Sequence, residues 1–240
     1  MAKSPSPGIA ARIDALDWGA IGEALDGFGC ATTGPLLTAA ECGALIALYD
    51  RDGVFRSRVV MARHGFGSGE YQYFAGPLPP LVAELRKALY PRLVATANRW
   101  QARLGGAPYP PRLDGFLRTC QAAGQRRPTP LLLKYQAGDY NCLHQDLYGA
   151  LAFPLQVAFL LSRPGADFTG GEFLLTEQRP RMQSRGEVVA LRQGEGVVFA
   201  VSRRPVAGRN GPYRVAMRHG VSRLRSGSRF TLGVIFHDAK

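Results

Sequence analysis

Three side chains of this 240-residue sequence have the types and spacing of a metal-ligand set. His144 and Asp146 are two positions apart, and in an extended strand such side chains point to the same side. His219, from a distant segment, completes a facial triad, which leaves metal positions open for a 2-oxo acid and O2. The pattern predicts an Fe(II) centre whose catalytic and metal-binding residues are these three. A surface hydrogen-bonded pair is the alternative explanation for the H-x-D tripeptide.

A candidate site for the second carboxylate of a 2-oxo acid follows His219. Arg229 and Thr231 alternate onto one face of an expected strand, where a guanidinium could grip a carboxylate in bidentate fashion and a hydroxyl could add a hydrogen bond. Tyr135, on the strand leading to His144, could donate a further hydrogen bond. We therefore expect these three residues to bind 2-oxoglutarate. The alternative is that Tyr135 is a core aromatic residue and Arg229 a surface charge.

Several stretches resemble known oxygenases. The stretch from Lys134 to Asp146, KYQAGDYNCLHQD, resembles the metal-site sequence of the AlkB-type 2-oxoglutarate oxygenases, R-Y-x-x-G…L-H-Q-D. The segments GGEF at 170–173 and GEGVVF at 194–199 resemble strands of the prolyl-hydroxylase-like oxygenases. From about Leu131 to Ala239 the chain is similar to a bacterial group of oxygenases that act on damaged, methylated DNA. The resemblance implies a double-stranded β-helix fold with Fe(II), 2-oxoglutarate and O2.

The sequence departs from these families at three positions. AlkB has an asparagine two residues before the tyrosine, where this chain has Leu133, and an acidic residue where this chain has Tyr148. Prolyl 4-hydroxylases usually carry lysine at the position of Arg229. The resemblance therefore implies that the chain binds the cofactors. It does not imply that the chain recognises a base in the way that AlkB does.

The elements that must position these residues fall into two parts. Residues 1–130 are expected to be mainly helical: a helical pattern from Ile9 to Leu25, a second helix from a capping box at Thr38 to Tyr49, and a long helix over 79–104 interrupted near Pro91. Residues 131–240 contain short apolar runs between turns, which predict an antiparallel sandwich. The fold class expected is α+β, a double-stranded β-helix (jelly roll) with N-terminal supporting helices, in a single globular domain.

The charge of the chain indicates a polyanionic partner. Lys and Arg outnumber Asp and Glu by 30 to 18, which gives a net charge of +12. The segment from Arg179 to Arg229 carries many arginines and only two acidic residues. Nucleic acid, as alkylated DNA and possibly as a single strand, fits such a surface. The alternative is an arginine bias of composition with solvated side chains.

Residues 54–74 are the candidate substrate-recognition lid, expected as a strand, a flexible glycine-rich loop and a second strand. Arginines and aromatic residues there could grip phosphates and stack on an extruded base. The alternative is that the tyrosines pack on the core. The candidate substrate-binding residues are Arg56, Arg58, Met61, Tyr71, Tyr73 and, beyond the lid, Tyr148.

No apolar run is long enough for a membrane span, and the first residues lack the apolar segment of a secretory signal. Four scattered cysteines fit reduced thiols, so a cytoplasmic enzyme without an obligate protein partner is expected. The leading hypothesis is oxidative demethylation of alkylated bases, with succinate, CO2 and formaldehyde as products. The alternatives are a hydroxylase of a protein side chain or small metabolite, and a non-catalytic nucleic-acid-binding β-sandwich.

Overall fold

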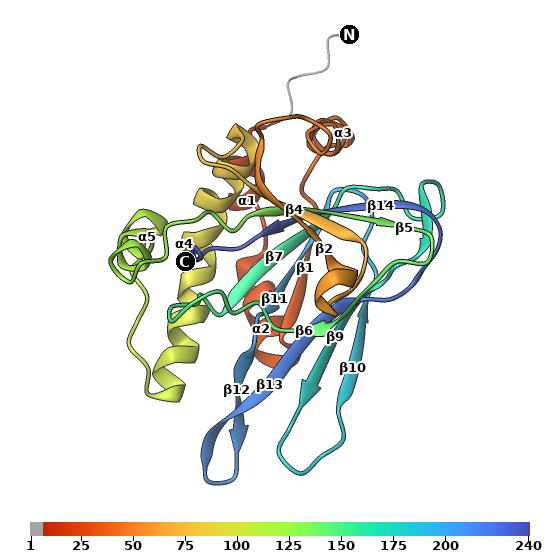
Figure 1. Cartoon of the computed structure of the whole chain (residues 1–240). Helices are drawn as coiled ribbons and strands as arrows, with labels where there is room; N and C mark the ends of the chain where they lie inside the picture. The colour runs from red at the N-terminus through yellow and green to blue at the C-terminus, as the bar shows by residue number, and fades with distance from the viewer. Residues whose placement is uncertain (1–6) are drawn as a thin grey trace.

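Two antiparallel sheets face each other in the computed structural model, which describes residues 7–240 (Figure 1). The larger sheet has eight strands in the order β1-β11-β7-β14-β5-β4-β2, with β8 paired to β14. It contains the most apolar strands, such as β7, because both of its faces are covered. The bounds are β1 Cys30–Pro35, β2 Phe55–Val60, β4 Glu70–Phe74, β5 Leu131–Gln136, β7 Leu155–Leu160, β8 Phe168–Gly170, β11 Glu195–Ala200 and β14 Leu224–Val234.

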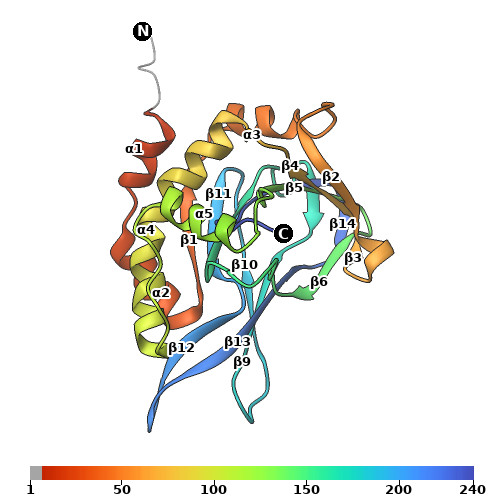
Figure 2. The same cartoon turned by 60° about the vertical axis from the view of Figure 1, so that its left-hand side comes forward.

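The smaller sheet has six strands in the order β10-β9-β13-β6-β3, with β12 paired to β13. Its hairpins β9–β10 and β12–β13 extend beyond the body of the sandwich (Figures 1 and 2). The architecture is the predicted α+β jelly roll. The bounds are β3 Gly67–Ser68, β6 Tyr140–His144, β9 Phe173–Gln178, β10 Arg185–Val189, β12 Arg203–Gly208 and β13 Gly211–Val221.

Helices cover one side of the larger sheet (Figure 2). The third helix begins with the predicted capping box, in which Thr38 and Glu41 each accept a hydrogen bond from the other's backbone N–H. The longest helix buries an apolar stripe that ends at Trp100 and packs against the first helix. The bounds are α1 Ile9–Asp14, α2 Trp18–Phe28, α3 Ala39–Ile46, α4 Pro80–Leu104 and α5 Leu113–Ala122, with a short 3-10 helix, η1, at Met61–His64.

The expected interruption of the long helix at Pro91 was wrong. The helix is continuous over 80–104, and Pro91 lies on its exposed face. The carbonyl of Lys87, which loses its helical donor to the proline, also belongs to an exposed residue and can bind water instead. The sequence patterns also missed β1 and α5, because each contains a glycine and neither shows a long apolar repeat.

The two strands expected in residues 54–74 are present as β2 and β4, and the glycine-rich segment between them contains η1 and β3. Strand β4 pairs with β2 on one side and with β5 on the other, and β3 pairs with β6. Gly69, at φ 118°, lies where a Cβ would come within 2.9 Å of the Tyr135 ring. The segment therefore belongs to both sheets. None of the helices within residues 7–240 is long and apolar enough to cross a membrane.

Candidate metal centre

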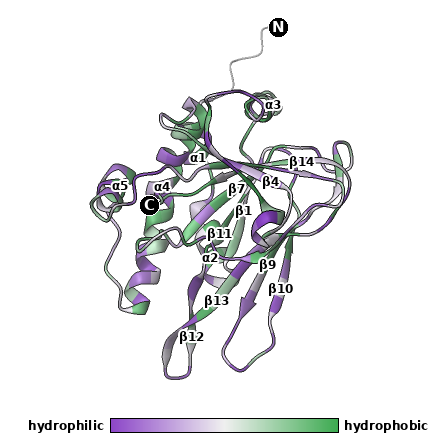
Figure 3. Ribbon diagram, in the orientation of Figure 1, coloured by the Kyte–Doolittle hydropathy of each residue, from purple (hydrophilic) through white to green (hydrophobic). Residues whose placement is uncertain are grey.

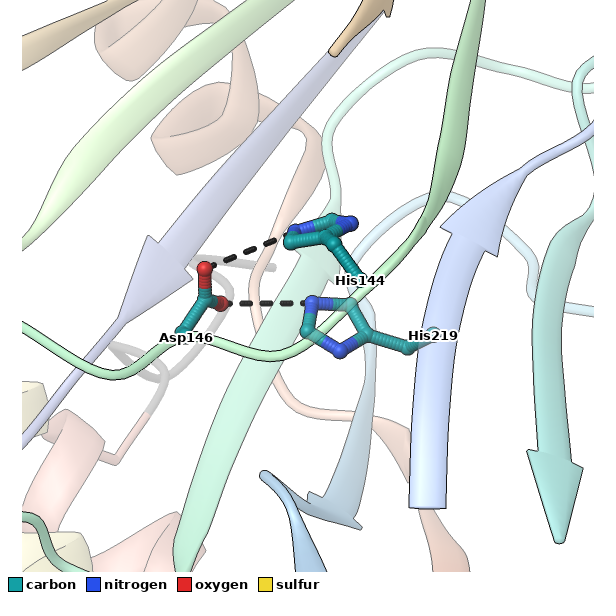
Figure 4. Close-up of side chains that lie close together, drawn as sticks. All are labelled: His144, Asp146 and His219. Atoms are coloured by element: carbon teal, nitrogen blue, oxygen red, sulfur yellow. Dashed lines mark ion pairs between the residues drawn. The ribbon is translucent and has the colours of Figure 1, made fainter. Parts of the chain in front are cut away.

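The three predicted ligands come together between the two sheets (Figure 4). His144 is the last residue of β6, and Asp146 lies two residues further along the chain. His219 lies in β13, where it is the register partner of His144. The cluster is therefore built by one strand pairing, and it confirms the prediction that a distant histidine joins the H-x-D pair.

The ligand atoms have the separations of a metal-ligand set. Asp146 Oδ1 lies 3.4 Å from His144 Nε2, and Asp146 Oδ2 lies 3.2 Å from His219 Nε2. All three ligand atoms lie within 4.8 Å of one another. Two ligands at right angles on a metal about 2.1 Å away would be about 3 Å apart. The donor set of two imidazoles and one carboxylate fits Fe(II).

The protonation states also suit a metal. Burial alone would raise the pKa of Asp146, but the neighbouring His219 and His144 outweigh it and hold that pKa well below its ordinary value. Burial lowers the pKa of His219, so its imidazole is neutral at pH 7. An ionised carboxylate and a neutral imidazole are the forms that bind a divalent cation.

Two residues hold the Asp146 carboxylate in place. Tyr148 Oη donates to Asp146 Oδ1 at 2.6 Å, and Gln156 Nε2 donates to Asp146 Oδ2 at 2.7 Å. Tyr148 was predicted to bind substrate, but its hydroxyl is directed at the carboxylate. Gln156 was missed, although a polar residue in the apolar run 155–161 was a usable signal. Carboxylates that bind metals are commonly oriented by such hydrogen bonds.

A cavity of about 420 Å³ adjoins the three residues. Phe66, Leu143 and Leu147 line it and are about half exposed, at 47%, 44% and 54%. Arg229 is the one lysine or arginine among the residues that line the cavity. The cavity therefore has an apolar mouth and a single cationic group inside.

Arg229 is buried, and its charge has no carboxylate partner among residues 7–240. Only 2% of the residue is exposed, and its Nη1 donates to Thr231 Oγ1 at 2.7 Å. Its Nε has no hydrogen-bond partner. Burial lowers the pKa of the guanidinium to about 10, so it keeps its charge at pH 7. A buried unpaired cation is costly, and a bound carboxylate would satisfy it.

Tyr135 lies beside Arg229 across the β5–β14 pairing, and all three predicted cosubstrate residues line the same cavity. The Arg229 Cζ atom is 5.6 Å from the centre of the Tyr135 ring. Tyr135 is fully buried, and its hydroxyl accepts a hydrogen bond from Asn141 Nδ2 at 3.3 Å. The expected grouping of Arg229, Thr231 and Tyr135 is thus present in space.

The other predicted substrate residues are dispersed. Tyr71 lines the cavity with Tyr148, whereas Met61 is fully buried in the core. Arg58 forms an ion pair with Glu70, with Nε 2.9 Å from Oε2. Arg56 lies over the Tyr73 ring, 4.5 Å from its centre, and donates to the Pro128 carbonyl. These residues are neighbours in sequence, but strand alternation directs their side chains to different sides of the sheet, so they do not form one surface.

Solved structures share this fold. A prolyl hydroxylase from Trichoplax adhaerens, solved with a hypoxia inducible factor peptide, has a TM-score of 0.57 at 15% identity, over 95% of this chain and 91% of that one. A prolyl-4-hydroxylase from Pseudomonas putida gives 0.55 at 16%, over 93% and 100%. A 2OG-Fe(II) oxygenase family oxidoreductase from Burkholderia pseudomallei gives 0.52 at 16%, over 99% and 95%. The chain therefore has the fold of these enzymes, and its two imidazoles and one carboxylate form a cluster that could hold a metal ion.

The sequence comparison is more specific. The Oxygenase-NA family, described as "Oxygenase, catalysing oxidative methylation of damaged DNA", matches residues 69–239. The uncharacterized proteins Rv2227 and MT2286 of Mycobacterium tuberculosis are each 54% identical over 167 residues, which is 69% of this chain and 72% of theirs. The chain belongs to the Oxygenase-NA family.

Proposed function

We propose that the protein oxidatively removes alkyl groups from nucleic acid bases, using Fe(II), 2-oxoglutarate and O2. One observation carries the proposal: a two-histidine, one-carboxylate cluster shares a cavity with a buried, unpaired arginine. A site for 2-oxoglutarate needs both features, because a metal would bind the 2-oxo acid end and a cationic side chain would bind the second carboxylate at the far end.

One group of residues would bind the metal, and a second group would bind 2-oxoglutarate. His144, Asp146 and His219 would hold the metal, and Tyr148 and Gln156 would orient Asp146. Arg229 and Thr231 would bind the distal carboxylate of 2-oxoglutarate, and Tyr135 would pack beside it. The distal carboxylate of the cosubstrate would then neutralise the buried charge of Arg229.

When bound, iron and 2-oxoglutarate supply the oxidation of a substrate C–H bond to C–OH by O2, with succinate and CO2 as coproducts. This chemistry contains no methyl donor, so we propose methyl removal as the reaction on DNA. A hydroxylated N-methyl group loses its C–N bond, which releases formaldehyde and returns the proton to the base nitrogen. The protein supplies position and exclusion of water, and no protein general base is needed.

Three features support a nucleic acid base as the substrate. The family description names damaged DNA, and the chain has a net charge of +12. The cavity mouth offers the exposed faces of Phe66, Leu143 and Leu147, which suit a flat, largely apolar group such as a base. Phosphates would have to be bound outside the cavity, since Arg229 is already committed to the cosubstrate.

The test is succinate formation by anaerobically Fe(II)-loaded protein, with methylated or unmethylated single-stranded DNA of one sequence. We expect turnover that needs iron, rises with methylated DNA and releases formaldehyde in equal amount. His144→Ala should abolish it, while His64→Ala, at an exposed histidine outside the cluster, should not.

Two results would change the proposal. Turnover that ignores methylated DNA would leave an oxygenase that acts on a protein side chain or metabolite. Absence of turnover from iron-loaded protein would overturn the oxygenase reading and favour a nucleic-acid-binding β-sandwich.

A further inference from the structure

A groove is lined by residues of the two hairpins that extend beyond the sandwich. Its volume is about 460 Å³, and both hairpins contribute to its lining. The basic lining residues are Arg179 and Arg181 from the β9–β10 hairpin, and Arg203 and Arg214 from the β12–β13 hairpin. No acidic residue is among those that line it. Figure 3 shows hydrophilic residues along parts of the two hairpins.

Glu177, which precedes the groove residue Gln178, is shared among three arginines. Glu177 is 3% exposed and contacts Arg179 at 2.7 Å, Arg185 at 3.6 Å and the buried Arg204. Arg204 also donates to the backbone carbonyls of Asp26 and Gly27, which fixes β12 to the end of α2. The single negative charge of Glu177 therefore lies near three positive charges. An excess of positive charge remains near the groove.

Two arginines at the groove have no internal partner. Within residues 7–240, neither Arg181 nor Arg203 forms an ion pair, and both are exposed. Arg214 donates only to the Leu104 carbonyl, at 3.3 Å. Free guanidiniums on facing hairpins repel one another unless an anion lies between them.

Strand β13 connects this groove to the metal centre. His219 points into the cavity, while Arg218 and Arg214 are exposed on the other side of the same strand. At about 3.3 Å per residue, Arg214 lies about 17 Å along the strand from His219. The groove and His219 therefore lie on opposite faces of β13, and a nucleic acid strand bound in the groove would have to pass around the smaller sheet to place a base in the cavity.

We propose that the groove lined by Arg179, Arg181, Arg203 and Arg214 binds the phosphodiester backbone of a single nucleic acid strand whose modified base enters the cavity. The inference rests on the proposed function for its substrate, and it assigns backbone binding to the two hairpins rather than to residues 54–74. Phosphate contacts would supply affinity without sequence preference, and the cavity would select the base.

The experiment measures binding of fluorescein-labelled, unmodified oligothymidylate to the full chain between about 50 and 200 mM salt. The groove variant is Arg181→Gln with Arg203→Gln. The control is Arg112→Gln with Arg118→Gln, two exposed arginines of the α5 region that pair with Asp114 and change the net charge equally. Arg181→Lys with Arg203→Lys keeps the charge and tests for folding defects.

We expect the slope of log affinity against log salt to become shallower by about 0.7 for each lost contact in the groove variant. The control and lysine variants should keep the slope of the unaltered protein, and so should His144→Ala. An equal loss in groove and control variants would overturn the groove and assign binding to net charge. Oligothymidylate that fails to bind would overturn it too, whereas succinate formation without DNA would still support the oxygenase.

Discussion

Arg229 keeps a positive charge where water hardly reaches it. Within residues 7–240, its one hydrogen-bond partner is the neutral hydroxyl of Thr231, and burial lowers its pKa to about 10. A protein that only needed stability would gain from an apolar side chain of similar size here. The residue is therefore explained by what it binds rather than by what it packs against.

Replacing Arg229 by methionine should separate binding from stability. We expect the affinity for 2-oxoglutarate to fall by about 100-fold, since a charge-assisted bidentate contact contributes about 3 kcal/mol. The melting temperature without cosubstrate should stay the same or rise. Calorimetric titration and thermal unfolding measure the two effects, with Arg229→Lys as the control that retains charge. A variant that binds 2-oxoglutarate as well as the unaltered protein would contradict the assignment.

Tyr148 should act through Asp146. Tyr148→Phe removes a 2.6 Å hydrogen bond to Oδ1 and little volume, so we expect Mn(II) affinity to fall by about tenfold. The affinity for oligothymidylate should not change, because the hydroxyl faces the carboxylate. Electron paramagnetic resonance of free Mn(II) gives the metal affinity. Unaltered metal binding with weakened methylated DNA turnover would restore the substrate role predicted for Tyr148.

At the residue scale, the sequence predicted which side chains meet when they lie two positions apart in an extended segment. The pairs His144 with Asp146 and Arg229 with Thr231 each lie two positions apart, and each pair meets in space. The hydrogen bond of Gln156 to Asp146 could not be predicted, because Gln156 lies in β7 of the larger sheet, whereas Asp146 follows β6 of the smaller sheet. Met61 was misjudged because a core methionine and a methionine that contacts a ligand have the same local pattern.

Helix α3 begins with a complete capping box. Thr38 and Glu41 form its capping box, and Arg12 of α1 donates to both carboxylate oxygens of Glu41, at 2.8 and 2.5 Å. The hydrogen bond from Arg12 lowers the pKa of Glu41 to about 2. A capping carboxylate here also links two helices.

The stability contributed by Glu41 should depend on pH. Its folded-state pKa lies below its ordinary value of 4.5, so the contribution is complete above that value and is lost as pH falls toward about 2. Glu41→Gln should lower the free energy of unfolding by about 1 to 2 kcal/mol at pH 7, and by less at about pH 3.5. Urea unfolding at both pH values measures this. An equal difference at both would show that the charge is not involved.

On the scale of the whole molecule, the two predicted parts are interleaved. Strand β1 pairs with β11, and β4 pairs with β5, so the larger sheet takes strands from both sides of residue 130. Arg86 of α4 also forms a buried ion pair with Asp238 at 2.7 Å. The jelly roll was predictable from its apolar runs, but these pairings were not, since they join segments far apart in the sequence.

A fragment of residues 131–240 should therefore fail to fold alone. It would expose β5 and β11 as unpaired edges and leave Asp238 without its partner. Circular dichroism should show no cooperative thermal transition, in contrast to the chain 7–240. A sharp transition in the fragment would show that the C-terminal part is a domain in its own right.

The pairing of His144 with His219 has one more consequence. A slip of one residue between β6 and β13 would turn one imidazole to the opposite face of the sheet. A divalent cation could then bind tightly only to chains in which these strands have found their proper alignment. Metal binding would thus stabilise chains with the correct strand alignment, and it would not stabilise misaligned chains.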